Sequence, residues 1–180
     1  MFAVGTPFRL DIGCGVRKKE GYHGVDIRQF DGVDTILDAG KDQWPWGDNT
    51  VDEVYASHFI EHLTAQQRIH FVNEAYRVLK PNGQLNMIAP SWSSMRAYGD
   101  LTHQWPPVTQ FWPLYLNREW RIVQQQAPHN DFYTCDFVGQ SVFGMHPSLV
   151  GRSIEYQTDA LTFLLEAAQD IIINLSARKG

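Results

Sequence analysis

Short apolar runs alternate with turns along the first half of the chain, and this alternation restricts the fold more than any other pattern in it. The runs lie at residues 8–12, 22–27, 34–37, 51–56 and 83–89. Between the last two, residues 64–79 repeat apolar side chains at helical spacing, and Thr64 with Gln67 has the pattern of a capping box. Strands that alternate with helical segments predict an α/β fold built on a mostly parallel sheet.

The second half has a weaker pattern, which predicts a helix over residues 117–126, a strand over 136–143, a helix over 154–167 and a last strand over 170–175. An irregular segment at about residues 90–116 precedes them. Five of the nine prolines lie between Pro81 and Pro113. Loops of this length in a compact domain are usually functional or disordered, and the tryptophan and tyrosine content of this one favours a function.

Length and composition indicate one globular domain, residues 1–180, because 43% of the residues are hydrophobic and 19% are charged. The net charge of −5 argues against a broad electrostatic interaction with nucleic acid or with an anionic membrane. Two cysteines cannot form a disulfide framework, and no apolar run approaches the roughly 20 residues that cross a bilayer. Residues 1–8 lack the pattern of a signal peptide. We therefore expect a cytoplasmic protein that binds no membrane.

Two glycines separated by one residue follow the first predicted strand, in the sequence Leu-Asp-Ile-Gly-Cys-Gly at residues 10–15. At the carboxyl ends of parallel strands, glycine lets backbone amides approach a ligand closely, so a nucleotide-like ligand fits. Asp26 follows Gly15 by eleven residues rather than the roughly 20 of a dinucleotide site, which disfavours NAD. The Asp26 carboxylate suits a ribose diol, and Asp38 suits the exocyclic amine of a base. Either aspartate could instead be an ordinary turn former.

Residues 9–90 resemble, in order, the class I S-adenosylmethionine-dependent methyltransferases, particularly the group often labelled type 11. The resemblance rests on the glycine motif at 10–15, the strand Gly-Val-Asp-Ile at 24–27 and the segments 44–63 and 74–83. It implies a Rossmann-like class I methyltransferase sandwich, with a mostly parallel seven-stranded sheet whose last strand is antiparallel. It also implies S-adenosylmethionine as the cofactor.

The same resemblance implies the residues of the cofactor site, all of which follow predicted strands. They are Asp11, Gly13, Cys14 and Gly15 on the methionine side, Asp26 and Ile27 at the ribose, Asp38 near the adenine, and Ser57 with His58 closing the pocket. The connection from Gly15 to Asp26 is short, and it leaves little room for the usual first helix of the family.

The expected function is methyl transfer from S-adenosylmethionine to a small-molecule acceptor, at oxygen or nitrogen. A sulfonium methyl group is already activated, so a base matters only where the acceptor must lose a proton. Asp100 and His103, three residues apart in the loop after the fifth strand, are the candidate catalytic pair, unless they only order the loop. For the whole chain, the alternative is a non-catalytic domain that binds S-adenosylmethionine or supports a partner.

Other chemistries are disfavoured. Residues 58–62 match the His-x-x-Glu-His pattern of one group of zinc peptidases, but a predicted strand runs into them and a helix cap follows at Thr64, so we expect no metal site. DNA amine methylation requires an Asn/Asp-Pro-Pro-aromatic sequence where this chain has Ser57-His58-Phe59. Neither cysteine, at 14 or 135, has the Pro-Cys context of cytosine methylation, so no nucleic-acid substrate is expected. Five aromatic residues of the loop suit either an apolar acceptor pocket or simple packing: Trp92, Tyr98, Trp105, Phe111 and Trp112.

Overall fold

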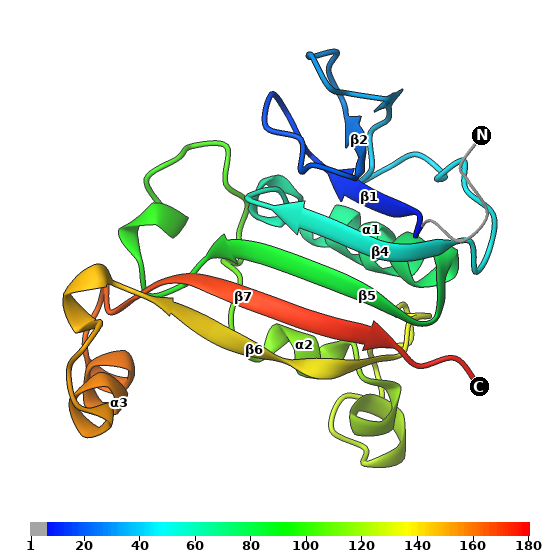
Figure 1. Ribbon diagram of the computed structural model, residues 1–180. Helices are drawn as coiled ribbons and strands as arrows, with labels where there is room; N and C mark the ends of the chain where they lie inside the picture. Colours follow the sequence, from blue (N-terminus) through cyan, green and yellow to red (C-terminus); the bar gives the residue numbers. More distant parts are fainter. Residues whose placement is uncertain (1–6) are drawn as a thin grey trace.

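The computed structural model describes residues 7–180, in which seven strands form one sheet (Figure 1). The strands are β1 (Arg9–Ile12), β2 (His23–Asp26), β3 (Thr35–Ile36), β4 (Val51–Ser57), β5 (Leu79–Pro90), β6 (Phe137–Met145) and β7 (Ala168–Ala177). Their order across the sheet is β3-β2-β1-β4-β5-β7-β6. Strands β1 to β5 pair in parallel, and β7 is antiparallel to both β5 and β6. The predicted sheet, mostly parallel with an antiparallel last strand, is confirmed.

The helices are α1 (Ala65–Val78), α2 (Trp112–Tyr115) and α3 (Ile154–Phe163), with 3-10 turns at Ile60–His62, Met95–Ala97 and Pro147–Leu149 and a π-helical turn at Glu119–Val123. None of these helices of residues 7–180 has both the length and the apolar character that crossing a bilayer requires. The prediction that residues 1–8 carry no signal peptide falls, up to residue 6, outside the described residues.

Helix α1 begins where the sequence predicts. The Thr64 side chain accepts a hydrogen bond from the Gln67 N–H, and the Gln67 side chain accepts one from the Thr64 N–H. The helix ends at Val78 because Leu79 is already extended and pairs with Val51, so β5 starts at residue 79 rather than 83. The predicted helix over 117–126 is only a π-helical turn, and α3 stops short of residue 167 because Leu164 is extended.

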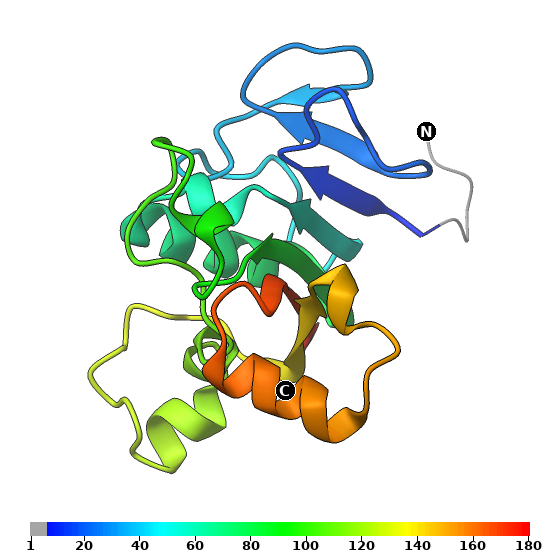
Figure 2. The same cartoon turned by 90° about the vertical axis from the view of Figure 1, so that its left-hand side faces the viewer.

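The sheet buries its apolar side chains on one face. Alternate residues of the central strands lie in this core: Val54, Ala56, Leu85, Met87, Ile173 and Leu175. In Figure 1 the apolar face points away from the viewer, and helices α1 and α2 lie behind it. No helix covers the face that points toward the viewer. Figure 2 shows α3 in front of the end of the sheet rather than over the bare face. The helices therefore cover one face of the sheet.

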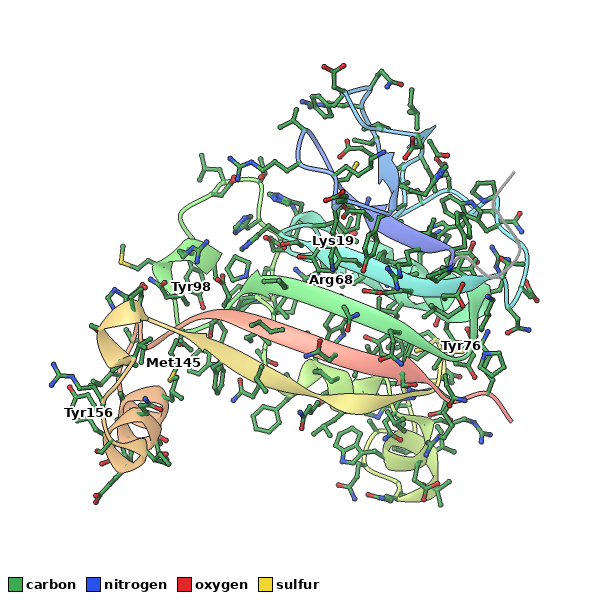
Figure 3. All side chains as sticks on the ribbon, viewed as in Figure 1. Lys19, Arg68, Tyr76, Tyr98, Met145 and Tyr156 are labelled. Atoms are coloured by element: carbon green, nitrogen blue, oxygen red, sulfur yellow. The ribbon has the colours of Figure 1, made fainter. Side chains whose placement is uncertain are left out.

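Polar side chains occupy much of the bare face of the sheet, and Ile88, Ile172 and Val142 form an apolar stretch on it. The alternate residues that point there include Glu53, Tyr55, Gln84, Asn86, Asn174 and Ser176. No helix forms between Gly15 and His23, as the short connection predicts. Instead, Lys19 lies on this face (Figure 3), with its Nζ 4.1 Å from the ring centroid of Tyr55 and 4.6 Å from that of Tyr22. Cation–π contacts and polar groups thus replace a helix layer over β1 and β4.

Leu175→Ala is expected to lower the free energy of unfolding by about 2–5 kcal/mol, because it empties part of the close-packed core. Leu175 is 1% exposed. The neighbouring Asn174 is exposed on the opposite face, so Asn174→Ala is expected to change stability by less than about 0.5 kcal/mol. Urea denaturation measures both values, and equal losses in the two variants would contradict this assignment of the faces.

Candidate cofactor and acceptor site

The turn after β1 brings backbone rather than side chains to the carboxyl ends of the strands. Gly13 and Gly15 have φ angles of +71° and +52°, which favour glycine. The Gly13 N–H donates a hydrogen bond of 2.8 Å to the carbonyl of Val25, which fixes the turn against β2. A Cβ atom on Gly13 would lie 2.4 Å from the ring of Phe59. Residue 13 therefore has to be glycine while Phe59 keeps its position.

Asp26 ends β2 beside this turn. One of its carboxylate oxygens accepts a hydrogen bond of 2.9 Å from the Gly15 N–H, and the other accepts one of 3.0 Å from the Arg28 N–H. A carboxylate has about four lone-pair positions, so Asp26 keeps acceptor capacity for a ribose diol. It therefore shapes the glycine turn and also remains able to bind a ligand.

Two cavities lie at the carboxyl ends of β1 to β4, and Gly13 and His58 line both of them. One, of about 520 Å³, is also lined by Asp26, Ile27 and Asp38. The other, of about 530 Å³, is also lined by Asp11, Cys14, Gly15 and Ser57. The structure thus brings all nine predicted cofactor residues to one region. The cavities have the size of small-molecule sites, and the carboxylates with exposed glycine backbone fit a nucleoside that carries a positive sulfonium.

Asp11 and Cys14 are the buried titratable groups of this region. Burial raises the pKa of Asp11, and a hydrogen bond of 2.7 Å from the Lys19 N–H opposes the shift. Burial, together with the negative charges of Asp11 and Asp26, raises the pKa of Cys14 to about 11. Cys14 is therefore a protonated thiol near neutral pH, and it forms part of the cavity wall rather than a nucleophile.

His58 connects the two cavities to the chain that follows β4. Its backbone has φ +51°, and its Nδ1 lies 3.3 Å from a carboxylate oxygen of Glu61. The interaction with Glu61 raises the pKa of His58, against the opposing effect of burial. The side chain of His58 is thereby held between the cofactor cavities and the buried Glu61.

Asp100 and His103, the predicted catalytic pair, line a smaller cavity of about 230 Å³ in the loop after β5. The Nδ1 of His103 lies 3.2 Å from the carbonyl oxygen of Ala97, and its Nε2 lies 4.0 Å from Asp100, too far for a hydrogen bond. Asp100 instead accepts hydrogen bonds from the N–H and O–H of Thr102, at 2.8 and 2.7 Å, and these bonds lower its pKa. Both side chains therefore help to order the loop.

Two of the five aromatic residues of this loop, Tyr98 and Trp105, line the cavity of Asp100 and His103, and the other three lie outside it. Trp92, Tyr98, Trp105 and Phe111 are exposed, and only Trp112 packs against the core. The Tyr98 hydroxyl donates a hydrogen bond of 2.7 Å to the Trp92 carbonyl, which orders the loop itself. Tyr98 and Trp105 thus belong to one cavity, whereas the five aromatic residues together do not form an aromatic box.

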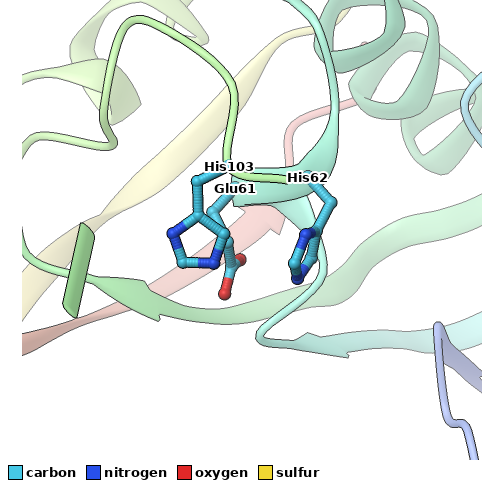
Figure 4. A group of neighbouring side chains, drawn as sticks. All are labelled: Glu61, His62 and His103. Atoms are coloured by element: carbon cyan, nitrogen blue, oxygen red, sulfur yellow. The ribbon is translucent and has the colours of Figure 1, made fainter. Parts of the chain in front are cut away.

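Glu61 and His62 lie beside His103, although the sequence analysis gave neither a role in the site (Figure 4). Their signal was the His-x-x-Glu-His pattern at residues 58–62. Residues Ile60–His62 form a 3-10 turn, so the pattern is not the helical motif of a zinc peptidase. No local periodicity could show that His103 folds back onto this turn.

A larger cavity, of about 680 Å³, lies near the amino ends of the parallel strands. Its charged lining residues are satisfied by one another and by backbone. Arg77 pairs with Glu74 at 2.7 Å, and Lys179 donates to the Arg77 carbonyl at 3.1 Å. Ligands of such sheets bind at the carboxyl ends of the strands, so we assign this cavity no part in the site.

Comparisons with known proteins agree with this geometry. Residues 10–87 match the family model described as a methyltransferase domain. No protein with a curated description matches the chain in sequence. A SAM-dependent methyltransferase from Archaeoglobus fulgidus superposes with a TM-score of 0.64 at 22% identity, over 96% of this chain and 86% of that one. An S-adenosylmethionine-dependent methyltransferase from Mesorhizobium loti gives 0.53 at 14%, over 98% and 93%. The [4+2]-cyclase SpnF gives 0.55 at 14%, over 98% and 77%.

The structural similarities show the fold, and the family match covers residues 10–87, which include the strand ends described above. The chain therefore has the fold of the class I S-adenosylmethionine-dependent methyltransferases, and residues 10–87 are similar to a methyltransferase domain. The family match ends at residue 87, before the loop at about residues 90–116, so it says nothing about that loop.

Asp26→Ala is expected to weaken the binding of S-adenosylmethionine by about 1–3 kcal/mol, because it removes charge-assisted hydrogen bonds to the ribose and frees the Gly15 N–H. Isothermal titration calorimetry with the cofactor and its demethylated product measures the effect. Asp31→Ala is the matched control, since Asp31 is exposed and lines neither cavity. An unchanged affinity in Asp26→Ala would reject the ribose assignment.

Proposed function

We propose that this protein is an S-adenosylmethionine-dependent methyltransferase and that it transfers the methyl group to a small-molecule acceptor, at an oxygen or nitrogen atom. It would act as one domain over residues 1–180, with the loop at about 90–116 on the acceptor side. The observation that carries the proposal is that His103, which lines a cavity of about 230 Å³, packs against His62, which lines the cavity of Asp26 and Asp38; the two ring centroids are 4.8 Å apart. The net charge of −5 argues against a nucleic-acid substrate. A cytoplasmic location remains a prediction from the sequence.

In this proposal, each strand end binds a different part of the cofactor. Asp26 with Ile27 takes the ribose, Asp38 takes the adenine, and Asp11 with the turn at residues 13–15 takes the methionine side. Ser57 and His58 close the pocket. S-adenosylmethionine supplies a methyl group on a positively charged sulfonium, so the protein has to position the acceptor and exclude water.

His103 is the proposed base for an acceptor that must lose a proton. The carbonyl of Ala97 can only accept a hydrogen bond, so Nδ1 of His103 carries the proton and Nε2 carries the lone pair. This nitrogen takes the proton of an O–H or N–H acceptor. Asp100 acts through Thr102, which it holds by two hydrogen bonds within the loop.

Incubation of the protein with methyl-labelled S-adenosylmethionine and fractionated metabolite extracts is expected to yield a labelled small molecule and an equal amount of S-adenosylhomocysteine. His103→Ala is expected to lower the rate by about 10²-fold or more while the dissociation constant of the cofactor stays the same. His129→Ala, at an exposed position outside the described cavities, controls for the loss of a histidine. Cofactor binding without transfer to any fraction would favour the non-catalytic alternative.

A further inference from the structure

Three side chains at the junction of the 3-10 turn Ile60–His62 and the acceptor-side loop bring their coordinating atoms together. Glu61, His62 and His103 each present one such atom, and these atoms lie within 4.8 Å of one another. Figure 4 shows the Glu61 carboxylate between the two imidazole rings. The rings themselves pack edge to face, with their centroids 4.8 Å apart. The ligands of a tetrahedral zinc ion, at 2.0–2.1 Å, are about 3.3 Å apart, so modest side-chain rotations would complete a site.

The hydrogen bonds of the two histidines leave the same ring nitrogen available. The hydroxyl of Thr102 donates to the ionised Asp100 and so accepts from Nδ1 of His62, at 2.9 Å. Nδ1 of His103 donates to the carbonyl of Ala97. Both rings therefore carry their proton on Nδ1 and their lone pair on Nε2. Metal-bound histidines typically have this arrangement, in which the second nitrogen donates to an oxygen and fixes the ring.

Glu61 supplies an independent sign of a missing ligand. Glu61 is 4% exposed, and the Oε2 atom of its carboxylate has no hydrogen-bond partner within residues 7–180. The other oxygen lies 3.3 Å from His58. A buried carboxylate oxygen without a partner costs free energy, and a cation would remove this cost.

Arg68 of α1 fixes the two segments that carry these ligands. Its buried guanidinium donates to the carbonyls of Ile60 at 2.9 Å and Gln104 at 3.1 Å, which adjoin Glu61 and His103 in sequence. The backbone N–H of Gln104 also donates to the carbonyl of Glu61, at 2.8 Å. The ligand-bearing segments are thus joined before any cation binds.

We propose that Glu61, His62 and His103 bind one divalent transition-metal cation of the zinc class on the acceptor side of the methyltransferase site. Two imidazoles and one carboxylate suit zinc, cobalt or iron, whereas Mg²⁺ prefers oxygen ligands only. Three protein ligands leave an open coordination position, as in catalytic zinc sites. His62 is exposed and also lines the cavity of Asp26 and Asp38, so the open position is accessible from the cofactor site.

The cation deepens the proposed function, on which this step rests, by changing the role of His103. A coordinated Nε2 has no lone pair left for a proton. The cation instead binds the acceptor heteroatom and lowers its pKa, and the proton leaves to water. The bond from the acceptor atom to the methyl carbon then forms as the carbon–sulfur bond breaks, with its electron pair on the sulfur.

The binding test uses the full chain after removal of metal by a chelator. Titration with Co²⁺, followed by its visible absorption, and with Zn²⁺, by calorimetry, is expected to show one site per chain. Glu61→Gln, His62→Ala and His103→Ala are each expected to weaken binding by about tenfold or more. His129→Ala is expected to bind as the unchanged protein does, and Mg²⁺ is expected not to compete. The site would be overturned if the unchanged protein showed no saturable binding, or if all three ligand variants bound the metal as tightly as the unchanged protein does.

Thr102→Val provides a second variant that leaves all three ligands in place. It is expected to weaken metal binding by about tenfold because the His62 ring loses its acceptor, and Thr102→Ser is expected to restore it. Both variants should retain the wild-type circular dichroism spectrum and cofactor affinity. Identical metal affinity in the valine and serine variants would contradict the assigned proton positions.

Metal binding and methyl transfer are measured separately, so each can fail alone. Metal titrations need neither cofactor nor acceptor, and Asp26→Ala is expected to bind Zn²⁺ normally while it binds S-adenosylmethionine weakly. Once an acceptor is in hand, chelation is expected to abolish transfer and Zn²⁺ or Co²⁺ to restore it. Transfer that is unaffected by chelation would return His103 to the role of base and overturn the catalytic part of the inference.

Discussion

The buried guanidinium of Arg68 joins the 3-10 turn after β4 to the loop after β5. Arg68 is 6% exposed and reaches three backbone carbonyls: those of Ile60, Gln104 and Pro106. A buried charge is tolerated only where hydrogen bonds satisfy it, so these three carbonyls have to stay where they are. Because Arg68 lies on α1, which packs on the sheet, the loop at about residues 90–116 takes its position from the core. Together with the hydrogen bond from the Gln104 N–H to the Glu61 carbonyl, Arg68 thus fixes this loop relative to the cavities at the strand ends.

Much of the fold could be predicted from the sequence because its signals are local. The apolar runs located every strand, and the capping box at Thr64 located the start of α1. The short connection after Gly15 correctly predicted that the first helix is missing. Element ends were less predictable: β5 begins at Leu79 because that residue pairs with Val51, a partner 28 positions away in sequence. Pairing between distant strands overrides the local pattern at such boundaries.

In the candidate site, too, some positions could be predicted from local sequence and others depend on contacts between distant residues. Residues of the cofactor region follow strands, and parallel strands bring their carboxyl ends to one edge, so sequence order alone predicts that Asp11, Asp26, Asp38 and Ser57 meet. The acceptor side has no such rule. Thr102 meets His62 across 40 positions, through a loop whose path is set by backbone contacts to Glu61 and Arg68. The pattern at residues 58–62 was visible in the sequence, but its third partner, His103, was not.

The two edge strands of the sheet are β3 and β6. The two edge strands of an open sheet carry unpaired amides and carbonyls, which can pair with a strand of another chain. The edge strand β3 contains only Thr35 and Ile36. The other edge strand, β6, contains Gly139 and has a register irregularity between Gly144 and Met145. Short or irregular edge strands are poor templates for a further strand. The β3 edge thus offers a further strand only two residues to pair with, whereas the β6 edge is longer, so strand addition at β3 is the less favourable of the two.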